Sequence, residues 1–125
     1  MASPPDRPFQ GRLFSVRVDH TEKGDREVVE HPGSVAVIAI DPEGRVALVR
    51  QHRQPIGRSL LEIPAGLRDV HGEDPEQTAR RELLEECALE AAQVRRLGAY
   101  YTSPGFCDER QELFPVSYTH LTLPT

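Results

Sequence analysis

The run Arg81-Glu82-Leu83-Leu84-Glu85-Glu86 constrains this chain more than any other feature. On a helix, Glu82, Glu85 and Glu86 are related as i, i+3 and i+4, so their three carboxylates project from one side. Carboxylates at this spacing repel one another, and Arg81 alone cannot neutralise all three. A divalent cation such as Mg²⁺ or Mn²⁺ can, because it prefers oxygen ligands. The alternative is a solvated acidic helix face.

The residues before this run predict where the helix begins and ends. Asp74 is a favourable N-cap, Pro75 suits the first helical position, and Gln77 stands where a capping-box partner belongs. We therefore expect a helix from Pro75 to about Cys87. Its packing stripe should turn away from the carboxylates, and it consists of Ala79, Leu83 and Cys87, with Leu84 beside them.

A strand should precede this helix. Residues Ser59 to Ile63 have the composition of a short strand, which Pro64 and Gly66 would end. The sequence thus predicts a strand, a loop and a helix, with a cation site at their junction.

This segment resembles the signature of the Nudix hydrolases. The matching positions are Gly66, Glu73, Arg81, Glu82, Leu83, Glu85, Glu86 and Leu89. Two positions depart from the family pattern. The spacer between Gly66 and Glu73 is one residue longer than the commonest form, and Ala88 replaces a glycine near the helix end. If that glycine supplies a left-handed cap, Ala88 costs about 1 kcal/mol or shifts the helix end.

The flanking residues resemble the ADP-ribose pyrophosphatase branch of this family, over roughly residues 10–115. Pro104 follows Leu89 at the distance that accompanies ADP-ribose preference in that branch, although an ordinary Pro-Gly turn explains Pro104 equally well. The resemblance implies metal-dependent hydrolysis of the pyrophosphate of ADP-ribose to AMP and ribose 5-phosphate. The alternatives are hydrolysis of another nucleoside diphosphate sugar or dinucleotide, and an inactive nucleotide-binding fragment.

The resemblance also implies roles for single residues of the signature. Glu82, Glu85 and Glu86 are expected metal ligands, with the backbone carbonyl of Ala65 as a further oxygen, and Glu85 and Glu86 are the expected catalytic residues. The structural part of the signature is Gly66, Glu73 and Arg81. Glu73 and Arg81 should form an ion pair that fixes the loop to the helix; the alternative is an exposed pair worth about 0–1 kcal/mol.

Substrate-binding residues are expected outside the signature. Arg53 follows a strand end, where the family places an arginine on the substrate, and a guanidinium suits phosphate oxygens. Asp108 and Glu109 follow a Pro-Gly turn, and Glu109 is the candidate for a ribose hydroxyl or a metal-bound water. The alternatives are a surface arginine and a solvated loop. His31 and His52 are interpreted as structural.

The fold class expected is the α/β Nudix fold, with mixed sheets and one helix that carries the signature, truncated at its C-terminus. Residues 1–33 are expected to form N-terminal strands that pair as a hairpin, Arg12 to Val18 with Arg26 to Glu30. This hairpin packs on its own chain or reaches a second subunit as the arm of a homodimer. Residues 34–115 form a partial Nudix domain, with further strands at Ser34 to Ile40 and Arg45 to Arg50.

The last ten residues, 116–125, differ from the rest of the chain. They contain no Asp, Glu, Lys or Arg, and they resemble the translation of a sequencing adapter. We expect them to be a non-native tail, with the native frame ending near Pro115, midway along a strand. The family's general base lies in a loop well after the signature, and this chain has no obvious equivalent of it.

Composition excludes several functional classes. A chain of 125 residues with 38% hydrophobic residues suits one domain with a modest core. Its net charge of −5 argues against a nucleic-acid partner. Two cysteines give no disulfide framework, and no stretch approaches membrane-spanning length. Composition thus favours a cytoplasmic protein that contacts no membrane, and the family resemblance adds the expectation of an enzyme that acts on a nucleoside diphosphate sugar.

Overall fold

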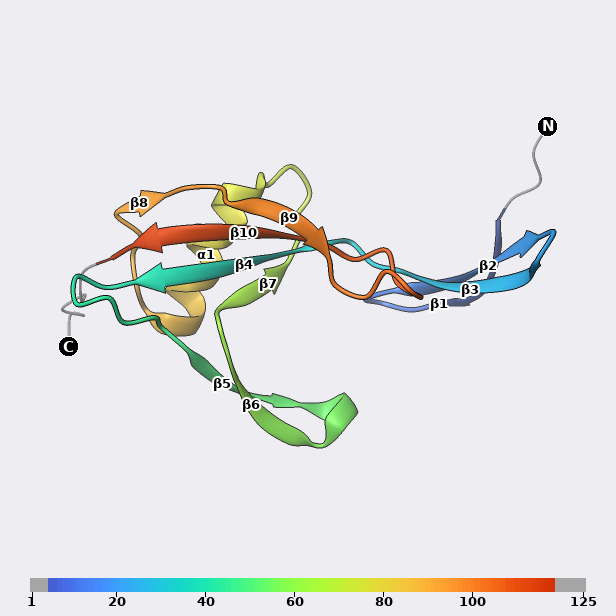
Figure 1. The fold of residues 1–125 in the computed structure, drawn as a ribbon, viewed down its shortest axis with the longest axis horizontal. Helices are drawn as coiled ribbons and strands as arrows, with labels where there is room; N and C mark the ends of the chain where they lie inside the picture. The colour runs from blue at the N-terminus through green and yellow to red at the C-terminus, as the bar shows by residue number, and fades with distance from the viewer. Residues whose placement is uncertain (1–4, 119–125) are drawn as a thin grey trace.

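The computed structural model describes residues 5–118. A three-stranded sheet lies at one end of an elongated molecule, a mixed sheet with a helix lies at the other, and a hairpin projects from the side (Figure 1). The elements in chain order are β1 (Asp6–Gln10), β2 (Ser15–Thr21), β3 (Gly24–Glu30), β4 (Ser34–Ile40), β5 (Val49–Arg53), η1 (Gln54–Ile56), β6 (Arg58–Glu62), β7 (Ala65–Leu67), α1 (Pro75–Cys87), β8 (Gln93–Val94), β9 (Gly98–Tyr101) and β10 (Arg110–Ser117).

The mixed sheet has the order β7-β4-β10-β8, and β9 also pairs with β10. Strands β4 and β10 are parallel, with Ser34 opposite Gln111 at one end and Ile40 opposite Ser117 at the other. Strand β7 runs antiparallel to β4. This pairing brings the start of β4, the start of β10 and the signature segment at β7 to the same region of the sheet.

The core lies between β4 and α1. Val35, Val37 and Ala39 alternate along β4 and are buried with Ala79 and Leu83 of the helix. The predicted stripe of α1 is therefore confirmed for Ala79 and Leu83. The expectation that Leu84 packs beside this stripe was wrong, because Leu84 is 54% exposed. Thr78 is the further buried residue of the packed face of α1.

The helix has the predicted bounds and caps. The carboxylate of Asp74 accepts a hydrogen bond from the Gln77 amide at 2.9 Å, and the Gln77 side chain accepts one from the Asp74 amide at 3.1 Å. At the other end, Ala88 takes the left-handed conformation, with φ 56°, and its N–H donates to the carbonyl of Leu84. The residue that replaces the family's glycine thus occupies the cap conformation that glycine favours.

The N-terminal sheet contains the predicted β2–β3 hairpin and one strand that was not predicted, β1. Strand β2 begins at Ser15 rather than Arg12, because a turn closed by the Gly11 amide and the Phe14 carbonyl holds residues 12–14 out of the strand. Glu30 accepts hydrogen bonds from Arg7, Ser15 and Arg17. The bond from Arg7, followed by that from Ser15, lowers the pKa of Glu30 to about 2.

The strand expected at Arg45 to Arg50 was placed too early. A turn after β4 is held by Asp41, whose carboxylate accepts hydrogen bonds from the backbone and side chain of Arg45. The chain then runs along the edge of β4, where Val46 makes an isolated bridge to Ile40, and β5 starts only at Val49. Strand β6, predicted at Ser59 to Ile63, is shifted by one residue.

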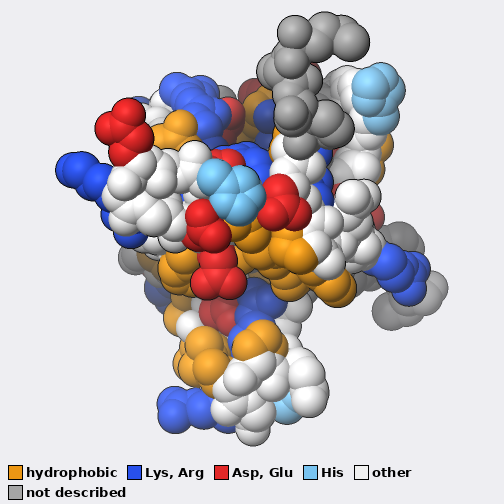
Figure 2. All heavy atoms as spheres, turned by 90° about the vertical axis from the view of Figure 1, so that its right-hand side faces the viewer, with side chains coloured by type: hydrophobic (Ala, Val, Ile, Leu, Met, Phe, Trp, Pro, Cys, Tyr) orange, Lys and Arg blue, Asp and Glu red, His pale blue; other side chains and the backbone are white. Residues whose placement is uncertain are grey.

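The β5–β6 hairpin stands away from the rest of the molecule. Seen from the end that carries the β1–β3 sheet, it forms the projection at the bottom of the view, with hydrophobic and basic side chains near its tip (Figure 2). The exposed hydrophobic residues Ile56 and Leu61 belong to this hairpin and its 3-10 turn. Strand β5 contributes Gln51 and Arg53 to the cavity described below.

Pro115 lies within β10, so the residue expected to end the native frame stands in a strand, as predicted. The expected tail continues beyond the described residues, and the division into arm, partial domain and tail stays a prediction. Between residues 5 and 118, no helix has the length and apolarity needed to span a membrane. Cys87 and Cys107 are free thiols.

Candidate functional site

A cavity of about 610 Å³ lies where β7, α1 and the starts of β4 and β10 meet. It collects most of the site residues predicted from the sequence, drawn from four separate segments of the chain. Those in its lining are Arg53, Ala65, Gly66, Arg81, Glu82, Glu86 and Glu109. The other two, Glu73 and Glu85, do not line it.

Glu82 lies directly against the backbone of β7. An added Cβ at Gly66 would stand 2.1 Å from Cδ of Glu82, so this approach requires a residue without a side chain. Burial raises the pKa of Glu82, and the nearby Glu85 raises it further, while Arg81 opposes the shift. The carboxylate is therefore held in the cavity at an electrostatic cost that a bound cation would offset.

Glu86 is held in the same cavity one helical turn further along. Its Oε2 accepts a hydrogen bond from the backbone N–H of Ala65 at 3.0 Å. Burial raises the pKa of Glu86, and repulsion from Glu82 adds to this, against the opposing effect of the Ala65 hydrogen bond. Ala65, predicted as a carbonyl ligand, thus lies next to the acidic pair, with its amide bound to one member of it.

Glu85 is separated from this pair. Its side chain is 57% exposed, and its carboxylate lies 3.4 Å from the guanidinium of Arg81. Among the described residues, no three or more His, Cys, Asp or Glu side chains converge as a potential metal site. The structure therefore brings two of the three expected carboxylates together, and a ligand role for Glu85 stays a prediction.

The expected ion pair between Glu73 and Arg81 is present. Nε and Nη2 of Arg81 donate to the two carboxylate oxygens of Glu73, each at 3.0 Å, and Thr78 donates a further hydrogen bond at 2.7 Å. The bond from Arg81, followed by that from Thr78, lowers the pKa of Glu73. Arg81 also contacts Glu82 at 3.0 Å, so one guanidinium connects the loop before α1 to an acidic residue of the cavity.

Arg53 enters the cavity from the last position of β5, next to the turn of the β5–β6 hairpin. Its Nε donates to Glu62 at 2.6 Å, and its Nη2 donates to the other oxygen of the same carboxylate. This pair lowers the pKa of Glu62 and raises that of Arg53. Glu62 was not selected from the sequence. No motif in the sequence singles it out, and only the β5–β6 pairing shows that Arg53 is in reach.

Glu109 also lines the cavity and directly precedes β10. Its two oxygens accept hydrogen bonds from the hydroxyls of Ser34, at 2.7 Å, and Thr102, at 2.9 Å. Nε2 of His31 lies 3.9 Å from the oxygen that Ser34 contacts. Asp108 instead accepts a hydrogen bond from the His31 backbone N–H and does not line the cavity.

His31 is a cavity residue that sequence reasoning set aside as structural. Its side chain is 12% exposed and belongs to the lining. No local sequence signal marks this role, because it depends on the parallel pairing of β4 with β10, which places the segment before β4 beside the segment before β10. His52, the other histidine considered, lies on β5 and contacts Gln54 at 3.2 Å.

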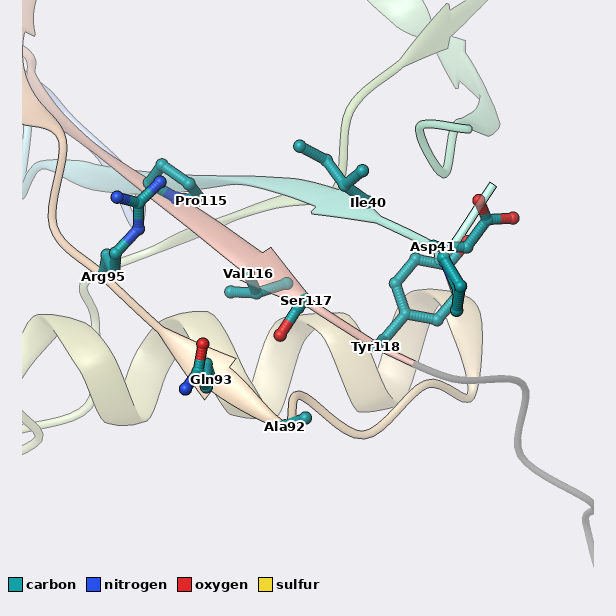
Figure 3. A pocket seen from close by; sticks show the side chains of 10 residues that line it. Ile40, Asp41, Ala92, Gln93, Arg95, Pro115, Val116, Ser117 and Tyr118 are labelled. Atoms are coloured by element: carbon teal, nitrogen blue, oxygen red, sulfur yellow. The ribbon is translucent and has the colours of Figure 1, made fainter. Parts of the chain in front are cut away.

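A second cavity, of about 490 Å³, lies at the far ends of β4 and β10 beside β8. Figure 3 shows that Ile40, Pro115 and Val116 give it an apolar character, with Asp41 and Arg95 at separate places on its rim. None of the site residues predicted from the sequence lines it. Its chemistry does not resemble that of a phosphate or metal site, so the acidic cavity is the candidate functional site.

The residues of the acidic cavity fit a hard divalent cation. Glu82 and Glu86 supply carboxylate oxygens, both with pKa values raised by burial, and the backbone of Ala65 lies beside them. Oxygen donors of this kind suit Mg²⁺ or Mn²⁺ better than a metal that prefers nitrogen or sulfur. Arg53 supplies a positive group across the same cavity.

Comparison with known proteins identifies the family of this domain. Residues 30–124 match the sequence profile of the NUDIX domain. An ADP-ribose pyrophosphatase of Bacillus subtilis (strain 168) is 43% identical over 111 residues, which cover 85% of this chain and 60% of that protein. A methanol dehydrogenase activator of Bacillus methanolicus is 46% identical over 111 residues, with the same coverage.

A third relative, an ADP-ribose pyrophosphatase of Mycobacterium tuberculosis (strain ATCC 25618 / H37Rv), is 44% identical over 109 residues. Those residues cover 83% of this chain and 53% of that protein. The chain thus spans between 53% and 60% of the length of these curated relatives. The expected mixed α/β fold with its signature helix is confirmed, and the chain belongs to the NUDIX domain family.

Proposed function

We propose that this Nudix domain serves the metal-dependent hydrolysis of the pyrophosphate of ADP-ribose to AMP and ribose 5-phosphate. The observation that carries the proposal is one cavity with an acidic pair, Glu82 and Glu86, on one wall and a guanidinium, that of Arg53, on another. Metal-assisted hydrolysis of a pyrophosphate uses cation ligands and a phosphate-binding group. Two relatives that bear the name ADP-ribose pyrophosphatase support the choice of substrate.

Glu82 and Glu86 would hold Mg²⁺ or Mn²⁺, with Glu85 and the carbonyl of Ala65 as further ligands. A cation held there would neutralise phosphate charge and lower the pKa of an attacking water. Glu82 stays in place through its contact with Gly66 and the hydrogen bond from Arg81, and Glu86 through the Ala65 amide. Both carboxylates are thereby oriented before a ligand arrives, which reduces the cost of organising the site.

Arg53 would bind phosphate oxygens, since a guanidinium donates to them in a fixed geometry. In the structure its donors are engaged by Glu62, so the substrate phosphate would share or take over that interaction. Glu109 would accept a hydrogen bond from a pentose hydroxyl. Ser34 and Thr102 fix its two oxygens, and a carboxylate accepts several hydrogen bonds at once.

The expected assembly is a homodimer with the β1–β3 sheet as its arm. The support for this proposal is the exposed aromatic pair Phe9 and Phe14, whose ring centroids are 5.7 Å apart. Exposed apolar clusters of this kind mark interaction surfaces. Sedimentation equilibrium should show a dimer that a Phe9→Asp, Phe14→Asp double variant converts to a monomer; a monomeric wild-type chain would contradict it.

The test of the function is hydrolysis of ADP-ribose beside other nucleoside diphosphate sugars and dinucleotides, with and without Mg²⁺. AMP release that depends on the metal and is fastest with ADP-ribose is the expected result. A clear preference for a non-adenine substrate would overturn the substrate choice. Calorimetric binding of ADP-ribose without product release would favour a nucleotide-binding fragment instead.

A further inference from the structure

His31 faces the cavity with a defined hydrogen-bonding pattern. Its Nδ1 accepts a hydrogen bond from the backbone N–H of Gly33 at 3.0 Å. A neutral imidazole that accepts at one nitrogen carries its proton on the other, so Nε2 of His31 is a donor. The ring is held on its backbone side as well, because the His31 N–H donates to Asp108 at 2.8 Å.

The carboxylate of Glu109 faces Nε2 of His31 and is fixed in place by other hydrogen bonds. Oε2 of Glu109 lies 3.9 Å from Nε2 of His31. Ser34 and Thr102 each donate to Glu109, and Gln111 donates to Ser34 at 3.0 Å, so the carboxylate cannot easily turn away. A separation of 3.9 Å is too long for a hydrogen bond between the two groups, which needs about 2.7–3.2 Å.

This separation suits one oxygen that bonds to both groups. An alcohol hydroxyl accepts one hydrogen bond and donates another, so it satisfies a donor and an ionised acceptor together. An oxygen at normal hydrogen-bond distance from each would bridge the two atoms. Both residues line the cavity that contains Glu82 and Glu86, so this hydroxyl would belong to a ligand whose phosphates lie near the acidic pair.

We propose that His31 and Glu109 form a hydroxyl-binding pair that recognises the terminal pentose of a nucleoside diphosphate sugar, with His31 as a specificity-determining residue. The inference rests on the proposed function for its substrate class. It goes further in giving His31 the role of donor and Glu109 that of acceptor to the same hydroxyl. A site that hydrogen-bonds a hydroxyl discriminates strongly against ligands without it, because its polar groups are then left unpaired.

Two substitutions separate this role from a structural one. His31→Leu and His31→Gln both remove the acceptor for Gly33, so any effect on folding is common to them. Only His31→Gln keeps an N–H near the position of Nε2. His52→Leu is the matched control, because His52 lies on β5 outside the cavity lining. Circular dichroism checks that all variants remain folded.

Calorimetric titration without added divalent metal measures the binding of ADP-ribose and of ADP, which lacks the terminal pentose. For ADP-ribose, His31→Leu should raise Kd about tenfold, while His31→Gln should raise it less than about threefold. For ADP, neither substitution should change Kd beyond about twofold. Turnover of ADP-ribose with Mg²⁺ should show the same pattern as a higher KM with kcat nearly unchanged.

The possible failures differ from one another. Equal losses for ADP-ribose and ADP, or equal losses in the two His31 variants, would overturn the hydroxyl-binding role and leave the hydrolase proposal standing. Selective loss of ADP-ribose binding in a chain that does not hydrolyse it would overturn the proposed function and support the pair. A wild-type chain that binds ADP-ribose no better than ADP would overturn the inference.

Discussion

Glu82 fills the space that a side chain at Gly66 would need. A Cβ built on Gly66 stands 2.1 Å from Cδ and 2.3 Å from Cγ of Glu82. Gly66 is not among the residues with positive φ, so it is required for room and not for backbone freedom. The glycine of the signature and its first helical glutamate are therefore one structural unit, in which β7 sets the position of a carboxylate on α1.

Gly66→Ala should move Glu82 out of its position while β7 remains paired, since alanine accepts the backbone conformation. The affinity for Mn²⁺, measured by calorimetry, should fall at least about tenfold. The free energy of unfolding should fall by about 1–3 kcal/mol from overpacking. Gly98→Ala is the matched control, because nothing lies within 4 Å of an added Cβ at Gly98. Unchanged Mn²⁺ affinity in Gly66→Ala would contradict the coupling.

Ala88→Gly should stabilise the protein. Ala88 has φ 56° at the end of α1, where a Cβ is strained and glycine is not. The free energy of unfolding in urea should rise by about 1 kcal/mol, although added chain entropy offsets part of the gain. Ala92→Gly lies nearby without positive φ and should give no gain. Equal effects in the two variants would rule out relief of strain as the cause.

The pair of Glu73 with Arg81 predicts a defined pH dependence. The folded state lowers the pKa of Glu73 from its usual 4.5, so the ionised form is stabilised by folding. Its contribution is complete above pH 4.5 and is lost as the pH falls through the lower, folded-state pKa. Glu73→Gln should thus be less stable than wild type at pH 7, and the difference should shrink below about pH 4.5.

Urea unfolding of both proteins from pH 7 to pH 3 measures this difference. Glu90→Gln serves as control, because Glu90 is exposed just beyond α1 and forms no ion pair within the described part of the chain. A difference that stays constant down to pH 3 would mean that Arg81 and Thr78 stabilise the neutral side chain as well. That result would remove the charge of Glu73 from the stability of the loop.

Local sequence signals were sufficient for α1 and β4. The capping box of Asp74 and Gln77 and the apolar stripe at Ala79 and Leu83 act within a few residues of one another, and the helix bounds followed from them. The start of β5 could not be predicted from local signals, because it depends on how Asp41 holds the turn after β4 and on the bridge between Val46 and Ile40. Such contacts have no signature in a local hydrophobic pattern.

The candidate site divides in the same way. Helical spacing predicted that Glu82 and Glu86 share one face of α1, and the resemblance to the family signature added Gly66 and Arg81 to the site. The pairs Arg53–Glu62 and His31–Glu109 could not be inferred in this way. The first depends on the pairing of β5 with β6, and the second on the parallel pairing of the distant strands β4 and β10. For Glu85, helical spacing predicted too much. It placed Glu85 with Glu82 and Glu86, whereas in the structure Glu85 pairs with Arg81 and is exposed.

Glu86→Gln should separate activity from stability. The amide oxygen of glutamine still accepts the hydrogen bond from Ala65, so the fold around β7 should be retained. Burial and Glu82 raise the pKa of Glu86 in the folded state. The ionised carboxylate is therefore less stable in the folded protein than in the unfolded chain, so its charge lowers the free energy of unfolding at neutral pH. Removing the charge should increase the free energy of unfolding at pH 7, and this increase should diminish as the pH falls and the wild-type carboxyl becomes protonated.

The same change removes a charged ligand, so we expect Mg²⁺-dependent turnover of ADP-ribose to fall at least about a hundredfold and Mn²⁺ affinity to fall with it. Glu76→Gln, at an exposed position in the first turn of α1, should alter neither quantity. Wild-type turnover in Glu86→Gln would remove Glu86 from the metal site. Loss of turnover together with lower stability would mean instead that the charge of Glu86 holds the fold, contrary to its raised pKa.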